Sequence, residues 1–179
     1  MTRRSADDQG VSLIELVAVV AILGVVGLVM GTLFSNVWRS QEAVNAQSQA
    51  TTRGQLIASE VERAMRNAIA FDVSADGTTL RVNTALGGGL RCQAFQLAAD
   101  GLHMTVASAP APAAASGWPL WQTDVTVASG SFITKSGTSI SYSFNALSKS
   151  GSRAVAAPVR FQGMAYMRNS AAGSLGPCW

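Results

Sequence analysis

The sequence VSLIELVAVVAILGVVGLVMGTLF, residues 11–34, decides which kind of fold this chain can have. From Leu16 to Met30 it contains no charged or strongly polar side chain. As an α-helix these 24 residues would extend about 36 Å, enough to cross a hydrocarbon core of about 30 Å. A secretory signal peptide has a shorter apolar core that is followed by small residues at a cleavage site. We therefore expect a helix that spans the membrane.

Glu15 is the one charged residue within residues 11–34. A carboxylate costs roughly 2.5 kcal/mol or more at the centre of a membrane helix. Its position close to the start of the apolar run therefore predicts a charged partner or a specific function.

The helical pattern continues beyond the apolar segment, through residues 35–70. No proline occurs before Pro110, and Glu62 and Arg66 stand four residues apart in the favourable order. Apolar residues recur at helical spacing, and we expect them to form one buried stripe: Ile57, Val61, Met65 and Ile69, widened by Leu56, Ala64 and Ala68.

The pattern changes to the alternation of β-strands in residues 71–179, with turns at Asp76-Gly77, Asp100-Gly101 and Ser136-Gly137. Three sets of alternating apolar residues are expected to face the helical stripe: Leu80/Val82, Leu102/Met104/Val106 and Ile140/Tyr142/Phe144. We predict an α+β fold, in which an antiparallel β-sheet packs against the C-terminal half of a long N-terminal helix.

The segment QG-VSLIELVAVVAILGVV, residues 9–26, resembles the class III signal of type IV pilins and type II secretion pseudopilins. That family has a polar leader ending in glycine, then an apolar residue, and a helix with glutamate at the fifth mature position. Gly10, Val11 and Glu15 match these three positions, and residues 1–10 match the leader. The helix end LIASEVERAMRNAIAF also looks like that of PilW-like minor pilins and J-type pseudopilins. Thr32 stands where many major pilins have a proline, which favours a minor subunit.

The resemblance implies that a prepilin peptidase cleaves the chain between Gly10 and Val11 and methylates the new amine of Val11. It implies that Glu15 pairs with the N-terminal amine of a neighbouring subunit and so sets the register of a filament. The partners would be that peptidase, other pilin or pseudopilin subunits and the inner-membrane assembly platform. The chain would cross the cytoplasmic membrane once, with a cytoplasmic N-terminus and the domain of residues 71–179 outside the cytoplasm, before it enters a pilus or pseudopilus.

Cys92 and Cys178 are far apart in the sequence and have no metal-ligand spacing. If the domain lies outside the cytoplasm, a disulfide between them is expected; two free buried thiols are the alternative. A disulfide here would also resemble the one that bounds the C-terminal region of many pilins.

Residues 108–119 are a loop by composition, and Trp118 and Trp121 lie at its end. An exposed pair of tryptophans would be a contact site for another subunit, a surface or DNA; the alternative is partial burial as a cover of the core. Residues 71–179 carry seven Lys and Arg against four Asp, a net charge of +3, which by itself does not predict nucleic-acid binding.

No motif of an enzyme occurs in the sequence, neither G-x-S-x-G, a P-loop nor G-x-G-x-x-G. The single histidine, His103, has no acidic partner that the pattern identifies, and we expect a surface or hydrogen-bonded strand residue. We expect a structural subunit without catalytic residues, cofactor or metal. The alternatives are a DNA-uptake pilin that binds DNA through its soluble domain, and a plain single-pass membrane-anchored domain.

Overall fold

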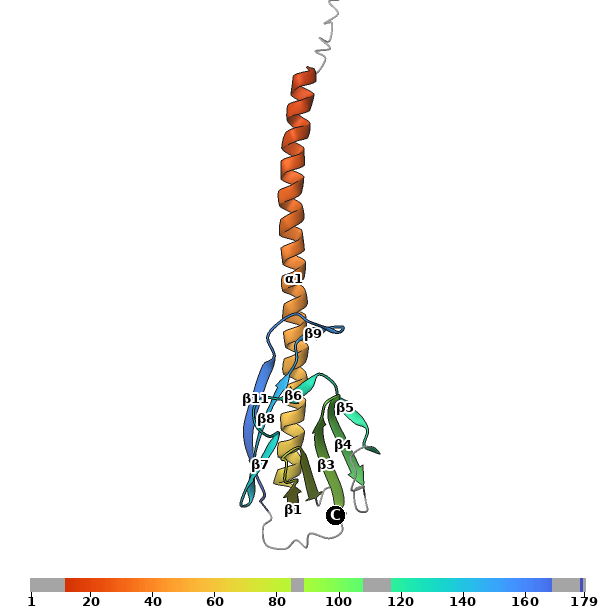
Figure 1. Cartoon of the computed structure of the whole chain (residues 1–179), viewed down its shortest axis with the longest axis vertical. Helices are drawn as coiled ribbons and strands as arrows, with labels where there is room; N and C mark the ends of the chain where they lie inside the picture. The colour runs from red at the N-terminus through yellow and green to blue at the C-terminus, as the bar shows by residue number, and fades with distance from the viewer. Residues whose placement is uncertain (1–11, 85–88, 108–116, 169–177, 179) are drawn as a thin grey trace, which may run out of the picture. The chain divides into compact units, whose positions relative to one another are not determined.

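The computed structural model describes residues 12–84, 89–107, 117–168 and 178, which contain one long helix, α1, and strands β1 to β11 (Figure 1). The fold is α+β, as predicted. The contacts divide the chain into two units, residues 1–41 and residues 42–179.

Helix α1 spans Leu13–Arg66. The carbonyl of Ser12 accepts the first intrahelical hydrogen bond, from the amide of Leu16 at 3.0 Å, so Ser12 is the N-cap residue. At the other end, the Asn67 side chain donates to the Arg63 carbonyl at 2.8 Å. The helix therefore ends four residues before the predicted limit of residue 70, because Asn67 satisfies a terminal carbonyl and Ala68 already pairs with β2.

The first sheet has the strand order β1-β2-β3-β4-β5, and all of its pairs are antiparallel. Its strands are β1 (Ala68–Val73), β2 (Thr79–Thr84), β3 (Arg91–Ala98), β4 (Gly101–Ala107) and β5 (Leu120–Gln122). Gly77 in the turn between β1 and β2 has a φ of 67°, a backbone conformation that L-residues with a Cβ rarely adopt.

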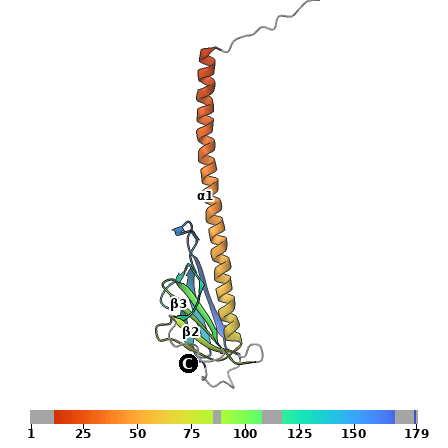
Figure 2. The same cartoon turned by 90° about the vertical axis from the view of Figure 1, so that its right-hand side faces the viewer.

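The second sheet has the order β11-β8-β6, and β7 also pairs with β8, again with every pair antiparallel. Its strands are β6 (Val125–Val127), β7 (Ile133–Ser136), β8 (Ser139–Ala146) and β11 (Val159–Tyr166), and β9 (Lys149–Ser150) and β10 (Arg153–Ala154) form a separate hairpin. The strands lie on one side of the C-terminal part of α1 (Figure 2).

The C-terminal part of α1 buries one stripe of residues, which recurs every three or four positions as a helix of 3.6 residues per turn requires and ends with two adjacent residues. The buried residues are Ala46, Ala50, Gly54, Ile57, Val61, Ala64 and Met65. The prediction is thus confirmed for Ile57, Val61, Ala64 and Met65. It is wrong for Leu56, which is 47% exposed because the strands cover a narrower arc of the helix. It is also wrong for Ala68 and Ile69, which lie in β1 rather than in the helix, although Ala68 is buried there.

The predicted alternation of the strands is confirmed at most positions. Leu80, Val82, Leu102, Ile140, Tyr142 and Phe144 belong to one buried cluster with the helical stripe, and Met104 packs against it. Val106 is an exception, since it is 50% exposed near the end of β4, where the core no longer covers it.

Two glycines allow aromatic rings to lie directly on backbone. A Cβ at Gly54 of α1 would overlap the ring of Phe161 in β11, and a Cβ at Gly163 would overlap the phenol of Tyr142 in β8. The Phe161 ring is also stacked on Phe144, with centroids 5.4 Å apart and an interplanar angle of 13°. These contacts pack β11, the edge strand beside β8, against α1.

Candidate functional site

The first described residues of the chain form the start of α1. Gly10 and Val11, the predicted cleavage and methylation positions, lie outside the described residues. Glu15 lies in the first turn of α1 and is exposed. With Ser12 as the N-cap, Glu15 occupies the third helical position, so the two residues have the spacing of a capping box. A carboxylate at this position also interacts favourably with the positive end of the helix dipole.

The apolar part of α1 has every side chain exposed from Leu13 to Gln41. Its large hydrophobic side chains are between 42% (Val26) and 80% (Leu13) exposed, so the described part of the chain provides no cover for them. This helix is long and apolar enough to cross a membrane. It is the one candidate span among the described residues.

An aromatic pair that was not predicted stands at the end of the apolar segment. The rings of Phe34 and Trp38 have centroids 5.6 Å apart, and each side chain is 66% exposed. Trp is enriched where a membrane helix leaves the hydrocarbon, and Arg39 follows directly. The order of apolar run, tryptophan and arginine was the signal in the sequence that could have identified this boundary.

Cys92 in β3 and Cys178 form a disulfide, which confirms the first of the two alternatives. Their Cα atoms are 5.3 Å apart and the cysteines are 86 positions apart in the sequence. Both are buried in a small cluster with Ala94 and Trp118. The bond ties the C-terminal end of the chain to the first sheet.

The two tryptophans at the end of the 108–119 loop do not form an exposed pair. Trp118 is only 4% exposed and lies against the disulfide cluster. Trp121 is half-buried and packs on Phe95, with ring centroids 6.3 Å apart. The structure therefore confirms the second alternative, in which the tryptophans are buried as a cover of the core.

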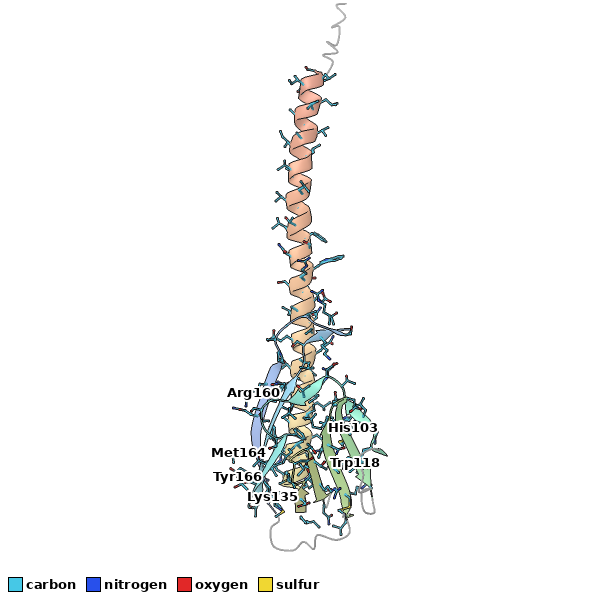
Figure 3. All side chains as sticks on the ribbon, in the orientation of Figure 1. His103, Trp118, Lys135, Arg160, Met164 and Tyr166 are labelled. Atoms are coloured by element: carbon cyan, nitrogen blue, oxygen red, sulfur yellow. A yellow bond between two sulfur atoms is a disulfide. The ribbon has the colours of Figure 1, made fainter. Side chains whose placement is uncertain are left out.

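His103 is a hydrogen-bonded residue of β4, as predicted, but one of its two partners is an acidic residue that the sequence pattern did not identify. Its Nε2 is 2.9 Å from Asp100 Oδ1, and its Nδ1 is 2.9 Å from the carbonyl of Trp118. Because both partners can only accept, the protonated imidazole satisfies both. The hydrogen bond to Asp100, and then that to the Trp118 carbonyl, raise the pKa of His103. His103 and Trp118 lie side by side in Figure 3, on the first sheet.

Polar contacts connect α1 to the strands beside the apolar stripe. Tyr142 Oη donates to Glu62 Oε1 at 2.7 Å, and burial together with this bond raises the pKa of Tyr142 well above its usual range. Gln93 Nε2 donates to Glu60 Oε1 at 2.6 Å. Burial opposes ionisation of Glu60, but the hydrogen bonds from Arg63 and Gln93 outweigh it and lower the pKa of Glu60.

Asp124 forms a third connection, at the start of β6. It accepts from Lys149 Nζ at 2.8 Å and lies 3.8 Å from Arg53 Nη1 of α1. The hydrogen bond from Lys149 is the main cause that lowers the pKa of Asp124, and burial opposes it. The three contacts make the register of helix and strands specific.

Within the described ranges, no group of three or more His, Cys, Asp and Glu side chains is close enough together to hold a metal ion. The residues that sequence and structure single out thus belong to the start of α1, its exposed apolar surface and the folded domain.

Comparison of the chain with protein-family models, curated proteins and solved structures finds no match.

Proposed function

We propose that the protein is a minor type IV pilin or pseudopilin, a structural subunit without enzymatic activity that is assembled into a pilus or secretion pseudopilus. The observation that carries the proposal is the exposed apolar part of α1, which no described part of the chain covers. A helix of this kind needs lipid or other helices around it. A pilin subunit occupies both environments, first the membrane and then the core of the filament.

In this proposal a prepilin peptidase cuts between Gly10 and Val11 and methylates the amine of Val11, as the resemblance implies. The new amine then stands two residues before α1 and four residues before Glu15. Glu15 pairs with the amine of a neighbouring subunit. Two opposite charges that meet in a water-poor helix bundle attract each other, whereas either charge alone is costly to bury.

Mass spectrometry of the chain, expressed with and without a prepilin peptidase, tests the proposed processing. We expect the mature protein to begin at methylated Val11 when the peptidase is present and at Met1 when it is absent. A Gly10→Glu variant should keep residues 1–10 under both conditions. A chain that begins at Met1 with the peptidase present, or that is cut beyond residue 30, would contradict the proposal.

Two substitutions separate the charge of Glu15 from its position in the capping box. Glutamine can replace glutamate in a capping box, whereas alanine cannot, and neither carries a charge. If Glu15 acts through its charge, Glu15→Gln and Glu15→Ala should both remain in the membrane and both be strongly depleted from filaments sheared from cells of the natural host. Normal incorporation of both variants would exclude the pairing role, and a defect of Glu15→Ala alone would assign Glu15 to the local structure of the helix.

The DNA-uptake alternative has less support. It relied on the net charge of +3 of residues 71–179 and on exposed tryptophans near the 108–119 loop, and Trp118 is buried.

A further inference from the structure

The outward face of the second sheet carries polar side chains in a regular arrangement. Residues that point away from α1 alternate along β11, and on the neighbouring strands they stand directly opposite hydroxyl residues. The cross-strand partners are Gln162 and Ser143, Met164 and Ser141, and Thr134 and Ser141. Figure 3 shows Arg160, Met164 and Tyr166 in succession along β11.

These side chains form the floor of an open groove of about 550 Å³, which Ser129, Gly130 and Ser131 border on one side. The volume is within the range of about 300–1,000 Å³ that is usual for small-molecule sites. Ser and Thr hydroxyls both donate and accept hydrogen bonds, and a Gln side chain also does both. The groove is therefore suited to a ligand that itself has many hydroxyl groups.

Arg160 is the one charged residue among the described residues that line the groove. Its Nη2 is 3.2 Å from Ser129 Oγ and 3.4 Å from Ser143 Oγ, and the ion pairs of the described residues do not include it. A guanidinium has five N–H donors in a planar fork that fits a carboxylate. The two hydroxyls orient the Arg160 guanidinium and leave donors for an anionic group of a ligand.

The apolar surface of this groove is small: Met164 lines its end away from Arg160, whereas Tyr166 lines the neighbouring hollow together with Glu62, Arg66 and Arg168. Met164 and Tyr166 are 56% and 57% exposed, and the Tyr166 hydroxyl is 4.0 Å from Met164 Sδ. The distance along the strand from Arg160 to Met164 is about 13 Å. The Met164 thioether can contact the C–H face of a sugar ring in an oligosaccharide whose acidic unit lies at Arg160.

Other classes of ligand fit less well. A nucleic acid carries a phosphate at each nucleotide and needs several cations along its path, whereas the described residues that line this groove include one, Arg160. An extended peptide is recognised by apolar side-chain pockets along a sheet edge, and this groove has hydroxyls in their place. We therefore propose that the groove over β7, β8 and β11 binds an acidic polysaccharide, with the carboxylate of a uronic acid unit at Arg160.

Binding of an end-labelled trigalacturonate to the full chain in detergent micelles, followed by fluorescence anisotropy, tests this proposal. We expect saturable binding, which Arg160→Gln weakens at least about tenfold because a charge-assisted hydrogen bond is lost. Arg91→Gln is the matched control, since Arg91 is exposed on β3 of the other sheet and its loss changes the net charge equally. It should bind like the unmodified protein.

A second variant, Ser141→Trp, fills the floor of the groove from an exposed strand position and should abolish binding while the thermal unfolding curve stays unchanged. The methyl ester of trigalacturonate should bind as weakly as trigalacturonate binds to Arg160→Gln. Absence of saturable binding, equal losses in Arg160→Gln and Arg91→Gln, or stronger binding of single-stranded DNA would each overturn the proposal. The assay requires neither processing nor assembly, so its failure would leave the proposed function standing. In the same way, failure of the processing test would leave the proposed binding site standing.

Discussion

Residues 13–41 and residues 42–66 belong to the same helix, yet their side chains have different surroundings. In the first part every side chain is exposed, including large hydrophobic ones. In the second part a stripe from Ala46 to Met65 is buried against the two sheets. Both parts are helical throughout, so helix formation does not distinguish them; packing does. The chain stabilises only the second part by packing, and the first part depends on surroundings that the chain does not supply.

Matched methionine substitutions should give the largest difference between the two parts. Met65 is fully buried and Met30 is 65% exposed. We expect Met65→Ala to lower the free energy of unfolding of the β-rich domain by about 2–5 kcal/mol, because it removes buried methylenes and leaves a cavity. Met30→Ala should change it by less than about 0.5 kcal/mol.

Chemical denaturation of the monomer in mild detergent, followed by near-ultraviolet circular dichroism, measures both effects. Equal changes in the two variants would contradict the comparison, since they would mean that residues 13–41 also pack against the folded domain.

Matched glycine substitutions should give a smaller difference of the same sign. Leucine at Gly54 would overlap the Phe161 ring, which cannot turn away without losing its stacking on Phe144. We expect Gly54→Leu to destabilise the domain by about 1–3 kcal/mol. At Gly27 a Cβ has no neighbour within 4 Å, so Gly27→Leu should only increase helix propensity, by less than about 1 kcal/mol.

Thermal unfolding of the two glycine variants in the same detergent gives the measurement. A Gly54→Leu variant as stable as the unmodified protein would show that β11 can move away from α1 at no cost, and the contact with Phe161 would then not determine the packing.

The helix was predictable because its signals are local. The apolar run of residues 11–34 and the four-residue spacing of Ile57, Val61 and Met65 depend on periodicity alone. The width of the buried stripe was not predictable, because it depends on how far the strands extend around α1. Leu56 lies outside the part of the helix that they cover. The end of the helix was also missed, since residues 67–70 are compatible with a helix until their pairing with β2 is known.

The candidate sites also differ in whether neighbouring residues in the sequence are enough to predict them. The Gly10, Val11 and Glu15 motif is read from consecutive residues, and so is the position of Trp38. The groove at Arg160 requires the pairing of β8 with both β7 and β11, and no feature of one sequence specifies that pairing. The contact of His103 with Asp100 spans only three positions, but it depends on the turn that brings the start of β4 back to the end of β3.

The smallest expected effect concerns the polar contacts that accompany the buried stripe. Tyr142→Phe removes the hydroxyl that donates to Glu62 and leaves that carboxylate with its ion pair to Arg66 at 3.4 Å. Because Glu62 keeps this partner and is partly exposed, we expect a loss of about 1 kcal/mol in the free energy of unfolding. Tyr166→Phe is the matched control, since Tyr166 is 57% exposed and its hydroxyl lies 4.0 Å from Met164 Sδ; its stability should be unchanged. If chemical denaturation gave the same stability for both variants, the hydrogen bond to Glu62 would contribute nothing, and the second part of α1 would be held on the sheets by apolar packing and by the contacts of Glu60 and Arg53.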